Sequence, residues 1–103
     1  MDPLKLHPMK LITIVCEAYA LEPVKTLLRE SGATGWTHFI VEGEGNRGER
    51  IADMPDYANV QIEIVIHPSK SEALLRRLQD EFFARYGMIA FESDVRVMRS
   101  NHF

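Results

Sequence analysis

The sequence predicts an α+β sandwich in which two helices cover one face of a four-stranded antiparallel sheet. Two observations lead to this prediction. Four short stretches are rich in β-branched residues or alternate between apolar and polar side chains, and two longer stretches carry helical spacing. Their order is strand–helix–strand–strand–helix–strand, which right-handed crossovers arrange as the ferredoxin-like βαββαβ sandwich.

The first half of the chain supplies a strand, a helix and a second strand. Residues Lys10–Glu17 are rich in β-branched side chains and apolar on both faces, which is typical of a central strand. The helix that follows has Pro23 in its first turn, and Gly32 suits the C′ position just beyond its end. Gly35 then leads into the second strand, Trp36–Glu42.

The second half supplies a strand, a helix and the last strand. Residues Asn59–His67 alternate most clearly, which indicates one buried face and one more polar face. Ser69 and Glu72 have the spacing of a capping box that opens the second helix, and Gly87 ends that helix. Alternation returns over Ile89–Val97, the predicted last strand.

A long polar loop, residues 43–57, separates the second and third strands. It contains Gly43, Gly45, Arg47 and Arg50; glycines allow close backbone approach, and arginine forks match phosphate or carboxylate oxygens. The Gly-x-Gly-x-x-Gly spacing is not a dinucleotide fingerprint, because no helix follows it. Two interpretations stay open: an anion-binding arm, or a solvated hairpin loop with an acidic balance.

Length and composition indicate one small domain. The chain has 103 residues, 46% of them hydrophobic, and a formal net charge of −3, which disfavours nucleic acid as a partner. We expect residues 9–103 to form the domain and residues 1–8 to be an N-terminal extension or a cloning remnant. Without a bilayer-length apolar run, a signal-peptide pattern or a second cysteine beside Cys16, the expected location is the cytoplasm.

The residue patterns favour assembly over catalysis. Two helices on one side leave the other sheet face uncovered, and that mixed, partly apolar face suggests a closed symmetric oligomer. The order of residues suggests no Ser–His–acid or Cys–His pair, and the histidines lack metal-ligand spacing. We therefore predict neither an enzyme, nor a metal site, nor a resident cofactor.

Four segments in this order resemble one known family. They are Gly-Ala-Thr-Gly-Trp-Thr at residues 32–37, the glycines Gly43 and Gly45, residues 59–65 of the third strand and residues 95–99 of the last. Together they resemble the PII signalling family, and within it the PII-like proteins linked to bicarbonate transport and carboxysomes. The resemblance extends from about Met9 to Arg99.

The resemblance implies a homotrimer with adenine-nucleotide sites between subunits and a target-binding T-loop, residues 43–57. The implied ligands are ADP, AMP or ATP and bicarbonate, and the implied partner is a membrane bicarbonate transporter or a carboxysome-linked protein. The family's second phosphate loop is shortened here to Tyr86–Met88, and Asn101 replaces an arginine. Fewer cations at the phosphate end favour ADP or AMP over ATP.

Position by position, the resemblance also implies which residues bind the nucleotide. Thr37 matches a threonine near the adenine, while Glu63 and Val65 match strand positions that line the base pocket. Arg99 matches a basic residue that faces the phosphates across the subunit interface.

The remaining implied contacts belong to two loops. Gly43 and Gly45 match glycines that pass close to the nucleotide, and Arg47 and Arg50 match arginines that reach the phosphates. Gly87 lies where the family has its second phosphate loop.

Three other functions are weighed against this one. A trimeric protein similar to the divalent-cation tolerance family would share the topology without a nucleotide switch, but the sequence lacks a metal-ligand cluster. A small dimeric α+β barrel acting on an organic acid would need a catalytic acid–base pair. RNA binding on the sheet face would need paired aromatics on the third strand.

Overall fold

A computed structural model describes residues 2–45, 48–50 and 58–103, and it confirms the predicted sandwich. Two short helical segments, the 3₁₀ turn Ala18–Ala20 and the π-helical turn Leu78–Phe82, join the main elements. The main elements are β1 (His7–Glu17), α1 (Leu21–Glu30), β2 (Thr37–Val41), β3 (Gly43–Gly45), β4 (Gly48–Arg50), β5 (Asn59–Ile66), α2 (Pro68–Arg77) and β6 (Ile89–Val97).

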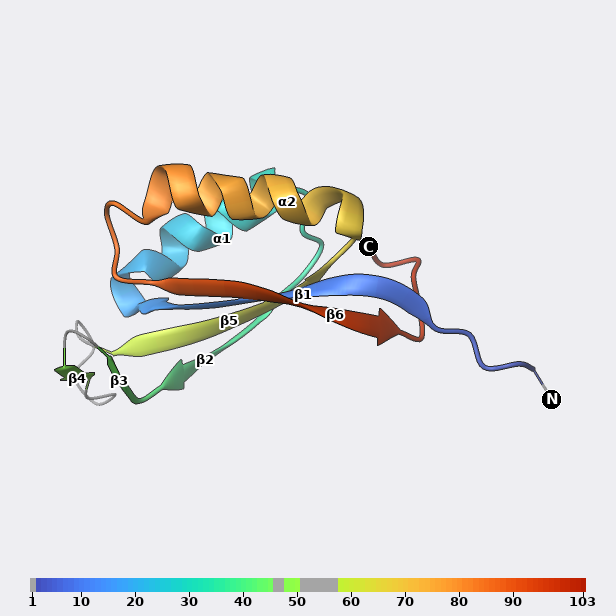
Figure 1. The fold of residues 1–103 in the computed structure, drawn as a ribbon, viewed down its shortest axis with the longest axis horizontal. Helices are drawn as coiled ribbons and strands as arrows, with labels where there is room; N and C mark the ends of the chain where they lie inside the picture. Colours follow the sequence, from blue (N-terminus) through green and yellow to red (C-terminus); the bar gives the residue numbers. More distant parts are fainter. Residues whose placement is uncertain (1, 46–47, 51–57) are drawn as a thin grey trace.

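The main sheet has the strand order β2-β5-β1-β6, with every neighbouring pair antiparallel. Both helices lie on the same face of this sheet, and among the described residues no helix covers the opposite face, called the bare face below (Figure 1). Along β5, buried residues alternate with half-buried ones, as the sequence predicts. The core beneath the helices consists mainly of Ile12, Ile14, Cys16, Val24, Leu27, Leu28, Val60, Ile62, Ile64, Ile66, Leu74, Leu78 and Phe82.

The helix ends agree with the sequence at α1 and differ from it at α2. Gly32 has the predicted left-handed backbone, with φ +83°, just after α1. The capping box predicted at Ser69 and Glu72 is wrong, because α2 already begins at Pro68. Its N-cap is His67, whose Nδ1 accepts the Ser69 amide hydrogen at 3.1 Å. Proline in the first helical position needs no intrahelical donor, so Pro68 fixes this earlier start.

The helix α2 passes into a wider turn before it ends. The Phe83 amide donates to the Leu78 carbonyl at 3.1 Å, an i→i+5 bond. The wider turn helps keep Leu74, Leu78 and Phe82, spaced four residues apart, together on the buried side. The turn that follows leads back to the sheet at β6.

Two further boundaries differ from the prediction. The N-terminal extension was expected to end at residue 8, but His7 and Pro8 already pair with β6 as part of β1. The loop over residues 43–57 begins with a hairpin in which Gly43–Gly45 pairs with Gly48–Arg50. Residues 46–47 and 51–57 of the predicted T-loop lie outside the described residues.

Candidate functional site

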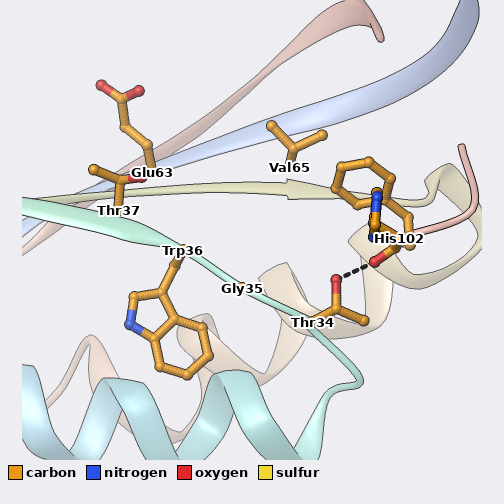
Figure 2. Close-up of a pocket in the computed structure, with 8 residues that line it drawn as sticks. Thr34, Gly35, Trp36, Thr37, Glu63, Val65 and His102 are labelled. Carbon is orange, nitrogen blue, oxygen red and sulfur yellow. Dashed lines mark hydrogen bonds between the residues drawn. The ribbon is translucent and has the colours of Figure 1, made fainter. Parts of the chain in front are cut away.

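A cavity of about 430 Å³ opens where β2 begins and β5 ends (Figure 2). It combines three of the predicted base-pocket residues with the connection into β2 and the last two residues of the chain. Its lining is Thr34, Gly35, Trp36, Thr37, Glu63, Val65, His102 and Phe103.

The strand register brings the three predicted residues together. Thr37 is the direct cross-strand partner of Glu63, and Val65 follows two residues later on the same face of β5. Residues directly opposite in an antiparallel pair share a face, so all three point to the side away from the helices. Figure 2 shows Thr37, Glu63 and Val65 on this side, with Trp36 turned the other way.

Trp36 therefore contributes to packing. Its ring packs against the core under the helices, and the Arg29 guanidinium carbon lies 5.4 Å from the ring centroid. A cation over an indole ring is a favourable contact, so Arg29 holds the ring on the helix side.

Glu63 gives the cavity an anionic acceptor. The side chain is half-buried, and its Oε1 accepts a hydrogen bond from Gln61 Nε2 at 3.1 Å. Beside it, the Thr37 hydroxyl can donate or accept, and Val65 is apolar. Two polar groups beside an apolar surface suit a flat heterocycle that carries an amino group.

The sequence reasoning missed the tail side of the cavity. His102 and Phe103 line it, and Thr34 Oγ1 donates to the His102 carbonyl oxygen at 2.5 Å. Both residues lie beyond the last strand, where no strand or helix period exists to orient them. The only available signal was the aromatic residue Phe103 after the polar residues 99–102.

Of the other predicted site residues, those that the structure describes are not among the lining residues of this cavity. Gly43, Gly45 and Arg50 belong to the β3–β4 hairpin, and Gly87 lies in the turn before β6. Arg99 is exposed just beyond β6. Arg47 lies outside the described residues.

The predicted site is thus divided between the two ends of the sheet. At one end, Val41, Asn59 and Glu17 are cross-strand neighbours, and the Gly87 amide donates to the Glu17 carboxylate. The cavity lies toward the other end of β2. Gly43 follows Thr37 by six residues, so about 20 Å of extended chain separates them.

The comparison with protein families decides what kind of protein carries this site. The family model of nitrogen regulatory protein P-II matches residues 9–102. The chain belongs to the P-II family. As a P-II protein it is a regulatory signalling protein and not an enzyme.

Solved P-II relatives share the whole fold. A protein from Thermus thermophilus, described as PII-like, is 35% identical; the match covers 95% of this chain and 94% of that chain, with a TM-score of 0.79. CPII from Thiomonas intermedia K12, bound to ADP, AMP and bicarbonate, is 27% identical, with 94% of both chains covered and a TM-score of 0.87. Its apo form is 26% identical, with 93% and 98% covered and a TM-score of 0.76.

At the Gly87 end of the sheet a buried carboxylate lies next to the predicted second phosphate loop. Glu17 is only 5% exposed, and its carboxylate accepts from both the Tyr19 hydroxyl and the Gly87 amide. These bonds satisfy a buried carboxylate that would otherwise be costly. A phosphate that used the Gly87 amide would have to displace Glu17.

Metal ligands and membrane helices are not part of this arrangement. Within the described ranges, no three His, Cys, Asp or Glu side chains are grouped so that they could hold a metal ion. In the same part of the chain, no helix has the length and apolarity needed to cross a bilayer.

Proposed function

We propose that this P-II protein binds an adenine nucleotide, ADP or AMP in preference to ATP, in clefts between the subunits of a homotrimer. It responds to bicarbonate and, through residues 43–57, regulates a bicarbonate transporter or a carboxysome-linked protein in the cytoplasm. The observation that carries the proposal is that Thr37, Glu63 and Val65 line one cavity on the bare face of the sheet.

The chemistry of the cavity favours adenine. Adenine presents an amino donor next to a ring acceptor, and the Glu63 carboxylate can accept from that amino group. In the same orientation guanine would place its carbonyl oxygen, a second acceptor, against the carboxylate. The base pocket is therefore expected to prefer ADP over GDP.

The divided site supports binding between subunits. The base-pocket residues lie toward one end of the sheet, and Gly43 and Gly87 lie at the other, about 20 Å of extended strand away. One small ligand reaches both sets when the base end of one subunit meets the loop end of its neighbour. Placing subunits against the bare face would also cover the exposed apolar side chains of Phe39, Ile89 and Phe91.

The charge at the loop end supports a ligand with few phosphates. The Glu17 carboxylate already accepts a hydrogen bond from the Gly87 amide. Each phosphate charge added at this end would therefore lie close to a buried carboxylate. Like charges at short range destabilise each other more where water is excluded. This agrees with the expectation that the shortened loop favours ADP or AMP.

The bicarbonate part of the proposal comes from the relatives. CPII from Thiomonas intermedia K12, which is 28% identical to this chain, has a solved structure bound to ADP and bicarbonate. Bicarbonate is a small planar anion that an arginine fork and backbone amides can hold. The T-loop carries both kinds of group, since it contains Arg47, Arg50 and several glycines.

Isothermal titration tests the proposed function. The protein is titrated with ADP, AMP, ATP, cyclic AMP and GDP, each with and without bicarbonate. We expect saturable binding of ADP or AMP near one site per chain, weaker binding of GDP, and an affinity that changes with bicarbonate. Absence of heat with every nucleotide, in folded protein, would refute the nucleotide sensor.

The variant Glu63→Gln tests the base pocket directly. Loss of a charged hydrogen bond should cost about 1.5–3 kcal/mol, which is a rise of about 10- to 150-fold in the Kd for ADP. GDP should lose much less, because its carbonyl oxygen no longer faces an anion. Glu72→Gln, an exposed change on α2, is the matched control and should leave both affinities unchanged. An equal loss for ADP and GDP would remove Glu63 from base recognition.

A further inference from the structure

The last residues of the chain return to the sheet after β6 ends. The strand finishes at Val97, and a turn closed by the Phe103 amide and the Ser100 carbonyl, at 3.4 Å, reverses the chain. The C-terminal end then lies beside the start of α2 (Figure 1). This tail, residues 98–103, thus crosses to the connection that precedes β2.

One hydrogen bond fixes the tail to the cavity rim. Thr34 Oγ1 donates to the His102 carbonyl oxygen at 2.5 Å, and the two residues are 68 positions apart in sequence. Thr34 precedes β2 by three residues, so the bond holds the tail against the strand that carries Thr37. The cavity remains about 430 Å³ with the tail in place, within the usual size of small-molecule sites. The tail is therefore a wall of the cavity and not a plug.

The tail also adds the aromatic side chain of Phe103 to the cavity lining. A bound purine gains affinity when its base stacks on an aromatic ring. Among the lining residues, the rings that could stack best are those of Trp36 and Phe103. Trp36 points to the helix side (Figure 2). There the Arg29 guanidinium carbon lies 5.4 Å from the centroid of the Trp36 ring. Phe103 is half-buried and lines the cavity with Glu63 and Val65.

We propose that Phe103 is the residue that stacks on the nucleotide base, and that the Thr34–His102 bond positions it. This inference rests on the proposed adenine site and adds to it a residue beyond the last strand. The tail then contributes to the specificity of the pocket. The Glu63 carboxylate accepts a hydrogen bond from the amino group of the base, and the Phe103 ring stacks on the flat face of the base. Affinity should then depend on ring area at position 103.

Titration of Phe103 variants with ADP tests this role. Phe103→Ala should weaken ADP binding by about 5- to 100-fold, since stacking on a base carries that share of affinity. Phe103→Trp should bind at least as tightly as wild type, and Phe103→Leu should lie between Ala and wild type. Phe83→Ala, which removes an exposed ring after the π-helical turn, should leave the affinity unchanged.

Two variants of Thr34 separate the positioning of Phe103 from the general stability of the protein. Thr34→Val removes the hydroxyl at nearly constant shape and should weaken ADP binding, whereas Thr34→Ser, which retains a donor, should bind more tightly than Thr34→Val. Melting temperatures of all variants are measured beside the affinities. Loss of affinity at an unchanged melting temperature supports the stacking role.

Failure of this inference differs from failure of the nucleotide site. If wild type binds ADP and Phe103→Ala binds it equally well or more tightly, Phe103 does not stack on the base. Equal affinities for Phe103→Ala, →Leu and →Trp would refute the ring-area dependence. If wild type binds no nucleotide, the proposed function fails and the stacking role fails with it.

Discussion

At the end of β1, a thiol and a carboxylate are buried next to each other in sequence. Cys16 is 1% exposed and Glu17 is 5% exposed. They point to opposite faces, because side chains alternate along a strand. Cys16 packs into the core below the helices, and Glu17 accepts hydrogen bonds from Tyr19 and Gly87.

Burial of Cys16 predicts a specific pH dependence of stability. Burial, and to a lesser degree the charge of Glu17, raises the pKa of the thiol from 9.0 to about 12. Between these values the unfolded chain has released the thiol proton while the folded chain still holds it. Rising pH therefore favours unfolding there, and this thiol should lower the free energy of unfolding by up to about 1.4 kcal/mol per pH unit.

Comparison with Cys16→Ala isolates this contribution. The variant is less stable at neutral pH because it leaves a small cavity, but its stability should decline less steeply between about pH 9 and 11. Urea unfolding at several pH values, at one protein concentration, gives both slopes. Parallel slopes for the two proteins would contradict a raised thiol pKa.

At the scale of elements, the sequence predicts best where burial imposes a period. The sequence predicts that β5 ends at His67, and in the structure it ends at Ile66. The prediction is this accurate because four isoleucine and valine side chains occupy alternate positions on the covered face of the strand. The register then places Thr37 beside Glu63, so this half of the candidate site follows from two correctly predicted strands.

The sequence does not predict the elements that are held mainly by backbone hydrogen bonds. The β3–β4 hairpin pairs Gly43–Gly45 with Gly48–Arg50, and neither strand has the apolar alternation that announces burial. The start of β1 was missed because Pro8 reads as a break. Residues His7 to Met9 pair with β6 but not with β5, and proline is tolerated where a strand lacks a second neighbour.

The observed cap of α2 gives a prediction for element stability. His67→Ala should lower the free energy of unfolding by about 1 kcal/mol, because the Ser69 amide loses its acceptor. His67→Asp should retain most of the stability, since aspartate is a strong N-cap and its charge favours a helix N-terminus. Ser69→Ala should cost less than His67→Ala. Stability is measured by urea unfolding at one protein concentration. A larger loss for Ser69→Ala than for His67→Ala would support the predicted capping box instead of the His67 cap.

At the scale of the whole molecule, the bare sheet face connects the fold to the function. Both helices lie on one side, and the other side exposes large apolar side chains: Phe39 is 42% exposed, Phe91 is 51% exposed and Ile89 is 64% exposed. Exposed apolar surface of this kind is typical of an association site. The base cavity opens on the same side, so covering this face and completing the site are one event in the proposed trimer.

Phe91→Glu tests that coupling. A charge buried at each copy of the interface should dissociate the trimer to monomers of 11.8 kDa, visible by sedimentation equilibrium. Phe83→Glu is the matched control: Phe83 is 47% exposed but lies after the π-helical turn, off the bare face. It should leave the trimer intact.

The same pair of variants decides whether the nucleotide site needs two subunits. Phe91→Glu leaves Thr37, Glu63 and Val65 unchanged in each chain, yet ADP affinity should fall by about 100-fold or more because the loop end of a neighbour is gone. Phe83→Glu should bind ADP like wild type. A Phe91→Glu monomer that keeps full ADP affinity would mean that one chain suffices, and the site would then have to lie within the cavity alone.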